Sequence, residues 1–172
     1  RLSREEVSYI LTNSEPSAIV VDSSLAGLIA NKPGTPWSEA EILVISSSEI
    51  ALPKHATLYE NAISTPGDKH PDADVDENSP AMILYTSGTT GYPKGAVLTH
   101  LNLFVQGITN IRAFRMFGDE ILMVATPLFH IAAIASVIPV MIIGGTTVVH
   151  PVGAFNPKEV IDVLEQEGVT SV

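Results

Sequence analysis

Short apolar runs alternate with helix-like segments along the first third of the chain. Residues 18–21 and 42–45 are continuous apolar runs, which are typical of strands buried on both faces of a parallel sheet. Before the first run, Ser3 and Glu6 have the spacing of a helix capping box. The apolar residues that follow this box at helical spacing are Val7, Ile10 and Leu11. This rhythm predicts an α/β fold, part of a layered α-β-α domain with a largely parallel sheet.

The second half of the chain continues the pattern. A helix is expected to begin after Thr99 and to reach about residue 117. The apolar positions that share one face of this helix are Leu101, Val105, Ile108 and Ile111. The elements expected after it are a strand at 121–125, a helix at 131–143 and a strand at 146–149. Asn156 and Pro157 are typical of the start of a helix, and Gly168 is typical of its end.

An apolar stretch in this half raises the question of a membrane span. No Asp, Glu, Lys or Arg occurs between Glu120 and Lys158. A helix that crosses a bilayer needs about 20 continuous apolar residues. The run is interrupted at Pro127, His130 and Pro139. A buried strand, a turn and a buried helix therefore explain the stretch better than a membrane span.

The segment from Glu60 to Pro80 has a different composition. Besides Glu60, five acidic residues crowd together in it: Asp68, Asp72, Asp74, Asp76 and Glu77. Such a cluster is either an acidic metal or partner site or a solvated linker, and we favour the linker because charge runs of this kind rarely pack. The organisation expected is a single domain fragment with first βα units at 1–59, an acidic linker at 60–80, and, at 81–172, a loop rich in glycine and hydroxyl groups followed by further βα units.

Composition narrows the class of protein. With 172 residues the chain is long enough for one domain, and its net charge of −10 argues against binding to nucleic acid or to an anionic membrane. The absence of cysteine excludes disulfides and a thiol nucleophile. No signal peptide is visible, so we expect a cytoplasmic location with at most peripheral membrane association. The chain begins at Arg1 and residues 169–172 begin a strand, so we interpret it as a fragment that is incomplete at both ends.

A loop of small and hydroxylated residues lies between two strand-like runs at 81–85 and 96–98. Its glycines are Gly88, Gly91 and Gly95, and its hydroxyl side chains are Thr86, Ser87, Thr89 and Thr90. Successive backbone N–H groups in such turns form an anion-binding nest, and Lys94 adds a positive charge for a phosphate. The pattern predicts a polyphosphate site.

Two common phosphate motifs do not fit this loop. In a P-loop the lysine directly follows a glycine and a helix comes next, whereas Tyr92 and Pro93 separate Gly91 from Lys94 and a strand-like run follows. The glycine intervals also differ from those of a Rossmann fingerprint. A plain hairpin with turn glycines is a weaker alternative, because it requires neither four hydroxyls nor a lysine.

The residues 85–95, Tyr-Thr-Ser-Gly-Thr-Thr-Gly-Tyr-Pro-Lys-Gly, resemble the signature loop of the adenylate-forming superfamily. The resemblance extends along the chain through the opening at 1–7, Pro127-Leu-Phe-His130, the run at 144–149 and the helix that starts at Phe155-Asn-Pro. Within the superfamily the sequence is most similar to fatty-acid and related acyl-CoA synthetases. The resemblance implies a reaction in two steps, with ATP, Mg²⁺ and coenzyme A. A carboxylic acid, expected to be a fatty acid, forms an acyl-adenylate, and a thiol then takes the acyl group.

The resemblance also implies roles for individual residues. The residues that would hold the β- and γ-phosphates of ATP are Thr86, Ser87, Gly88, Thr89, Thr90, Gly91 and Lys94. Thr86 would also offer its hydroxyl to Mg²⁺. Phe129 and His130 would line the acyl pocket, although a lone histidine in an apolar stretch is more often a structural residue. The family often has a glycine shortly after this histidine, whereas residues 131–133 are Ile-Ala-Ala here, which leaves the pocket depth and the acyl-chain length open.

The remaining functional groups of the family are expected downstream of residue 172. These are its adenine, ribose and metal-binding motifs and its catalytic lysine, so the fragment alone is expected to be inactive. Two alternatives stay open: a non-catalytic nucleotide- or phosphate-binding module of the same fold, and an enzyme that loads another acid onto a carrier-protein thiol. A homodimer is also compatible with the sequence.

Overall fold

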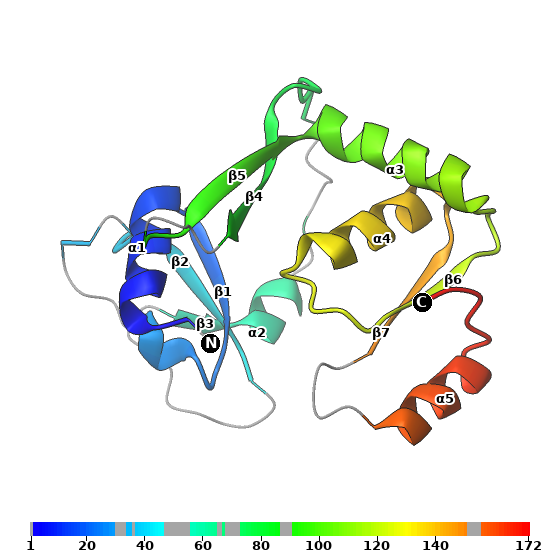
Figure 1. Cartoon of the computed structure of the whole chain (residues 1–172). Helices are drawn as coiled ribbons and strands as arrows, with labels where there is room; N and C mark the ends of the chain where they lie inside the picture. The colour runs from blue at the N-terminus through cyan, green and yellow to red at the C-terminus, as the bar shows by residue number, and fades with distance from the viewer. Residues whose placement is uncertain are drawn as a thin grey trace. The chain divides into compact units, whose positions relative to one another are not determined.

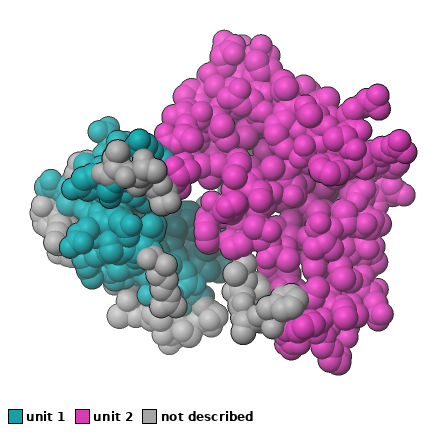
Figure 2. Space-filling view, in the orientation of Figure 1, with its two compact units in different colours: residues 1–73, 87–94 teal, residues 74–86, 95–172 magenta. Residues whose placement is uncertain are grey.

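The computed structural model describes residues 2–29, 34–35, 37–46, 56–64, 67, 73–86, 91–150 and 156–172 (Figure 1). The chain divides into two compact units, which Figure 2 shows in different colours. Unit 1 comprises residues 1–73 and 87–94, and unit 2 comprises residues 74–86 and 95–172.

Unit 1 contains a three-stranded parallel sheet whose strands follow one another in chain order. The strands are β1 (Ala18–Asp22), β2 (Glu41–Ile45) and β3 (Ala56–Leu58). Ala18 pairs with Glu41, and Ile42 pairs with Ala56. The helices of the unit are α1 (Arg4–Ser14), the short 3₁₀ helix η1 (Ala26–Leu28) and α2 (Tyr59–Ser64). This sheet confirms the predicted parallel arrangement, whereas the sequence pattern did not indicate β3 or α2.

The core of unit 1 forms around the central strand. Ile42 and Val44 of β2 are completely buried, and they pack with Ile19 and Trp37. Helix α1 covers this core with Val7 and Leu11. The predicted capping box at the start of α1 is confirmed: the Ser3 backbone N–H donates to Glu6 Oε2 at 2.7 Å, and the Glu6 N–H donates to Ser3 Oγ at 3.2 Å. These bonds satisfy two N–H groups that a helix start would otherwise leave free.

Unit 2 contains two separate pairs of strands, except that Lys94, the first residue of one strand, belongs to unit 1. β4 (Pro80–Thr86) and β5 (Lys94–Thr99) are hydrogen-bonded neighbours, and only seven residues connect them. A parallel crossover needs about a dozen residues or more, so this pair is an antiparallel hairpin. β6 (Ile121–Val124) and β7 (Thr146–Val149) form a parallel pair, and Ser171 makes a parallel bridge to Leu122 on the other side of β6. The helices of the unit are α3 (His100–Phe114), α4 (Ile131–Ile143) and α5 (Pro157–Gln166).

Helix α4 packs on one face of the β6–β7 pair. Leu122 and Val124 form a buried cluster with Ala133 and Val140. Met123 lies between the two strand residues, so its side chain points to the opposite face, where only 1% of it is exposed. The chain crosses from β6 through α4 to β7, and it then returns from β7 through α5 to Ser171 on the other side of β6. Two right-handed crossovers that run in opposite directions across a sheet put their helices on opposite faces. This rule assigns α5 to the face of Met123. Both faces of β6 are thus covered.

Two consecutive glycines take the chain from α4 into β7. Gly144 has φ of +76°, and its N–H caps the helix by donating to carbonyls of the last turn. A Cβ on Gly145 would lie 2.7 Å from the carbonyl oxygen of Glu120, so the second glycine allows a close approach to the start of β6. A side chain is therefore disfavoured at Gly144 by the backbone conformation and at Gly145 by the lack of space.

The packing of α3 differs from the prediction in two respects. The helix ends at Phe114 with Arg115 in the left-handed region, before residue 117. Val105 and Ile108, predicted to be on the buried face, are 53% and 44% exposed. The side that packs against α4 instead centres on Gly107, because a Cβ there would meet Ile142 Cδ1 at 2.5 Å. A close helix crossing at a glycine replaced the expected apolar ridge.

The long apolar stretch folds as β6, a turn, α4 and β7, as predicted. Among the described residues, no helix is long and apolar enough to cross a membrane.

Candidate functional site

The predicted phosphate loop joins the two strands of the β4–β5 hairpin. Gly95 lets this hairpin close tightly at the base of the loop, because a Cβ on it would lie 2.9 Å from Ile83 Cγ2 and 3.2 Å from the Tyr85 ring. The Tyr85 side chain therefore lies over the backbone of Gly95, which is a recurrent way to cover a glycine in a strand. Thr86 is the last residue of β4 and Lys94 is the first residue of β5.

The centre of the loop is only partly described. Ser87, Gly88, Thr89 and Thr90 lie outside the described residues, so their predicted contacts with phosphate stay predictions. Gly91 has φ of +97°, a left-handed conformation that favours glycine. The two residues that follow it differ in burial: Tyr92 is 66% exposed, and Pro93 is buried.

The second part of the candidate site lies at the carboxyl end of β6. Phe129 and His130 occupy the turn between β6 and α4, and the Phe129 side chain is 83% exposed. His130 is the N-cap of α4: its backbone is extended, and its Nδ1 accepts a hydrogen bond from the Ala132 N–H at 3.1 Å. A nitrogen that accepts this bond carries no proton, so the neutral ring carries its proton on Nε2. Nε2–H is thus a hydrogen-bond donor at the start of the helix.

The strand order puts this histidine where open α/β sheets bind ligands. The chain leaves β6 toward α4 and leaves β7 toward α5, and those two helices are assigned to opposite faces of the sheet. Ligands of such sheets bind beyond the carboxyl ends of the strands, at the point where the connections diverge. The turn that holds Phe129 and His130 is at that point. The motif predicted an acyl pocket at these two residues, and that function stays a prediction.

The two parts of the candidate site fall in different units. Residues 87–94 are in unit 1, and Thr86, Phe129 and His130 are in unit 2. The phosphate loop and the turn with Phe129 and His130 are therefore described separately.

The carboxyl end of the acidic segment is hydrogen-bonded to the start of α3. The Asp76 carboxylate accepts from the Asn78 N–H at 2.7 Å, which makes a local turn. The Glu77 carbonyl accepts from the Leu101 N–H at 2.8 Å, and the Ser79 carbonyl accepts from the His100 N–H at 3.3 Å. Asp68 and Asp72 lie outside the described residues. Within the described part of the chain, no three His, Asp or Glu side chains gather in a way that could hold a metal ion.

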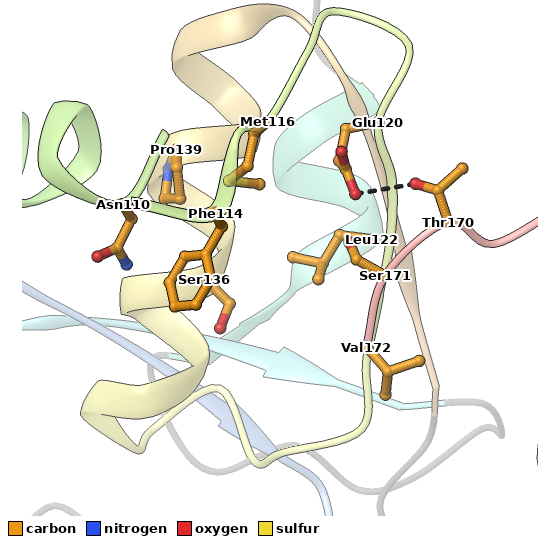
Figure 3. A pocket seen from close by; sticks show the side chains of 10 residues that line it. All are labelled: Asn110, Phe114, Met116, Glu120, Leu122, Ser136, Pro139, Thr170, Ser171 and Val172. Carbon is orange, nitrogen blue, oxygen red and sulfur yellow. Dashed lines mark hydrogen bonds between the residues drawn. The ribbon is translucent and has the colours of Figure 1, made fainter. Parts of the chain in front are cut away.

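A cavity of about 470 Å³ lies in unit 2, and the sequence pattern did not indicate it (Figure 3). Side chains from α3, α4 and the start of β6 line it, together with the chain at 170–172. Thr170 Oγ1 donates to Glu120 Oε1 at 2.9 Å and accepts from the Ile121 N–H at 2.9 Å, which holds the last residues against β6. Because this cavity is beside the amino end of β6, the end opposite to His130, we do not assign the phosphate or acyl site to it.

Comparison with known proteins places the whole chain in one family. The family model of AMP-binding enzymes matches residues 1–172. An indoleacetate–CoA ligase from Aromatoleum aromaticum is 30% identical over 172 residues, which is 99% of this chain and 32% of the relative. A feruloyl-CoA synthase from an Amycolatopsis species is 42% identical over 106 residues, which is 61% of this chain and 21% of the relative. The chain therefore spans about a third or less of the length of these relatives.

Solved structures agree with this fold. The N-terminal domain of FACL13 from Mycobacterium tuberculosis matches with a TM-score of 0.80 at 24% identity, over 98% of this chain and 40% of that one. ATP-bound MatB from Rhodopseudomonas palustris matches with a TM-score of 0.75 at 26% identity, over 96% of this chain and 31% of that one.

Proposed function

Because this chain belongs to the AMP-binding enzyme family, we propose that it is part of the large N-terminal domain of a longer ATP-dependent acyl-CoA synthetase. In the proposed reaction a carboxylate attacks the α-phosphorus of ATP and expels pyrophosphate, and the thiol of coenzyme A then takes the acyl group from the acyl-adenylate. The observation that carries the proposal is the loop of glycines and hydroxyls between β4 and β5, with Thr86 and Lys94 at its two ends.

This loop is suited to the leaving group of the first step. Negative charge accumulates on the pyrophosphate as it departs, and N–H groups, hydroxyls and a cation fixed around it stabilise that charge. The proposed phosphate contacts come from residues 86–91 and from Lys94. The ATP that is present in the MatB structure supports a nucleotide as the ligand.

Magnesium fits this arrangement through Thr86. Mg²⁺ prefers oxygen ligands and keeps several water molecules, so a single threonine hydroxyl together with phosphate oxygens suits it without a carboxylate cluster. When bound, the ion supplies positive charge that offsets the phosphates.

The acyl pocket is proposed to begin at Phe129 and His130. A substrate carboxylate can accept a hydrogen bond from His130 Nε2–H, and the bond from the Ala132 N–H to Nδ1 fixes the orientation of the ring. The exposed Phe129 ring offers an apolar surface to the acid. Both residues position the substrate, and neither is required to transfer a proton.

The class of acid has two candidates. A medium- or long-chain fatty acid is supported by a medium-chain-fatty-acid–CoA ligase from Ectopseudomonas oleovorans, which is 26% identical over 99% of this chain. An aromatic acid is the second candidate, and it is favoured by the higher identities to the feruloyl and indoleacetate enzymes. Coenzyme A is proposed as the acceptor in both cases.

ATP–pyrophosphate exchange by the longer protein tests this proposal. The panel contains octanoate, palmitate, ferulate, indole-3-acetate and an amino acid, each with ATP and Mg²⁺. Exchange that depends on one fatty or aromatic acid, followed by formation of its CoA thioester, is the expected result. Nucleotide binding without exchange for any acid would favour the non-catalytic module instead.

A further inference from the structure

The phosphate loop contacts helix α1 through a pair of tyrosines in unit 1. The ring centroids of Tyr9 and Tyr92 are 5.0 Å apart, and the rings are tilted by 31°. This separation is in the range of favourable aromatic pairs. Tyr92 stands between Gly91, whose φ is +97°, and the buried Pro93. The contact therefore falls on the turn that leads the chain into Lys94.

The rest of α1 places Tyr9 for this contact. Val7 and Leu11 pack against the core of unit 1 and fix the helix on that side. Since two residues along a helix rotate a side chain by about 200°, Tyr9 faces away from this core. The Tyr9 side chain is nevertheless partly buried, and Tyr92 is the aromatic ring against it. Helix α1 thus packs on the core of unit 1 with one face and contacts Tyr92 with the other, while Tyr92 stays 66% exposed.

We propose that Tyr9 is a positioning residue for the phosphate loop. By holding Tyr92 against α1, it reduces the number of conformations open to the turn at 91–93 before a ligand binds, and a preorganised loop binds at a lower entropic cost. Tyr9 itself need not touch the ligand. The identity of that ligand, the phosphates of ATP, rests on the function proposed above.

Trypsin cleavage after Lys94 tests the tyrosine contact without any enzymatic activity. Tyr9→Ala in the longer protein is expected to speed cleavage at this bond about two- to tenfold. Loss of one aromatic pair raises by this factor the fraction of molecules in which the turn at 91–93 is detached from α1, and trypsin cleaves that fraction. Tyr9→Phe keeps the ring and should cleave at the wild-type rate. Thr12→Ala, at an exposed position of α1, is the matched control. Equal cleavage of wild-type protein and Tyr9→Ala would overturn the proposal. If Tyr9→Ala fails to fold, Tyr92→Ala makes the same test from the loop side.

The dependence of exchange on ATP concentration tests the link to function. Tyr9→Ala and Tyr92→Ala are each expected to raise the KM for ATP about two- to tenfold with a smaller change in kcat, and the double variant should be no worse than either single one. Additive effects, or a change confined to kcat, would overturn the positioning role. Wild-type protein that catalyses no exchange would refute the proposed function, while the cleavage rates would still decide whether Tyr9 holds the loop.

Discussion

The side-chain amide of Asn110 donates a hydrogen bond of 3.1 Å to the backbone carbonyl of Ala135. In a regular helix this carbonyl would accept from residue 139, but Pro139 has no N–H to donate. Gln106, one turn earlier on α3, donates to the same oxygen at 3.4 Å. Helix α3 therefore supplies the hydrogen bonds that the proline removes from α4, and the half-buried Ala135 carbonyl keeps its partners.

Asn110→Ala is expected to destabilise the protein by about 1–3 kcal/mol, because it leaves the Ala135 carbonyl with one long bond only. Pro139→Ala restores an N–H within reach of that carbonyl, so the cost of Asn110→Ala should shrink in a Pro139→Ala background. Urea unfolding of the two single variants and the double variant measures this difference. An equal cost of Asn110→Ala in both backgrounds would show that the proline and the amide are independent.

Gly107→Ala is expected to lower stability although alanine is the better helix former. Its Cβ would lie 2.5 Å from Ile142 Cδ1 and 3.0 Å from Ile138 Cγ2, so these two side chains would have to move or the two helices would have to shift apart. Overpacking of this kind costs about 1–3 kcal/mol, against a gain of about 1 kcal/mol in helix propensity. Thermal unfolding is the measurement, with Gly27→Ala as the control, since a Cβ at that position meets nothing within 4 Å. A melting temperature that rises for Gly107→Ala would contradict the close crossing.

Lys94→Ala is expected to slow ATP–pyrophosphate exchange about ten- to a hundredfold, because a charge-assisted contact to the leaving group is worth about 1.5–3 kcal/mol. Lys158→Ala is the matched control: it removes the same charge from α5, where the side chain is 81% exposed. Exchange that falls equally in both variants would indicate a general charge effect and would remove Lys94 from the assigned site.

Two variants separate the functions of the two His130 nitrogens. His130→Asn keeps an oxygen that can cap α4, so stability should stay near that of wild type while the KM for the acid rises. His130→Ala removes the cap as well and should also cost about 0.5–2 kcal/mol in unfolding experiments. A wild-type KM in His130→Asn would mean that the residue serves the helix alone.

Acid should weaken α1 through Glu6. Hydrogen bonds from the backbone N–H and then the side chain of Ser3 lower the pKa of the Glu6 carboxyl below its ordinary value. A group with a lowered pKa in the folded state contributes stability above its unfolded pKa, and the contribution is lost as the pH falls through the folded pKa, here below about pH 4. Glu6→Gln retains an N3 side chain that can cap, so it should reduce this acid sensitivity. Circular dichroism against pH, for both proteins, tells whether the slope below pH 4 decreases.

Local sequence signals predicted most of the elements because they act over a few residues. The Ser3–Glu6 box, the Thr99 cap and the start of α4 at residue 131 all depend on neighbours within one helical turn. The buried side of α3 could not be found in this way. Apolar periodicity predicted a buried face with Val105 and Ile108. The surface of α3 that packs against α4 depends instead on Gly107 and on the carbonyl of α4 that Pro139 leaves without a helical partner.

The candidate site was predictable to the extent that it is a linear motif. Residues 86–95 are contiguous, so their resemblance to a phosphate loop is visible without a fold. The contact between Tyr9 and Tyr92 joins positions 83 residues apart, and no local pattern in either segment indicates it. Strand β3 was missed for a different reason, since three residues are too short for a recognisable alternation.

The strand order β7–β6–Ser171 has a consequence for the sequence of assembly. Leu122 pairs with Thr147, which lies 25 positions further along the chain, whereas its bridge to Ser171 joins positions that are 49 apart. Each doubling of such a separation adds about 0.6 kcal/mol of closure entropy, and during synthesis the nearer partner also leaves the ribosome first. β6 therefore acquires its two neighbours in a fixed order, β7 before the chain at 171. The central strand stays open on one edge until α5 has been made, and that edge is where a wrong partner would add during folding.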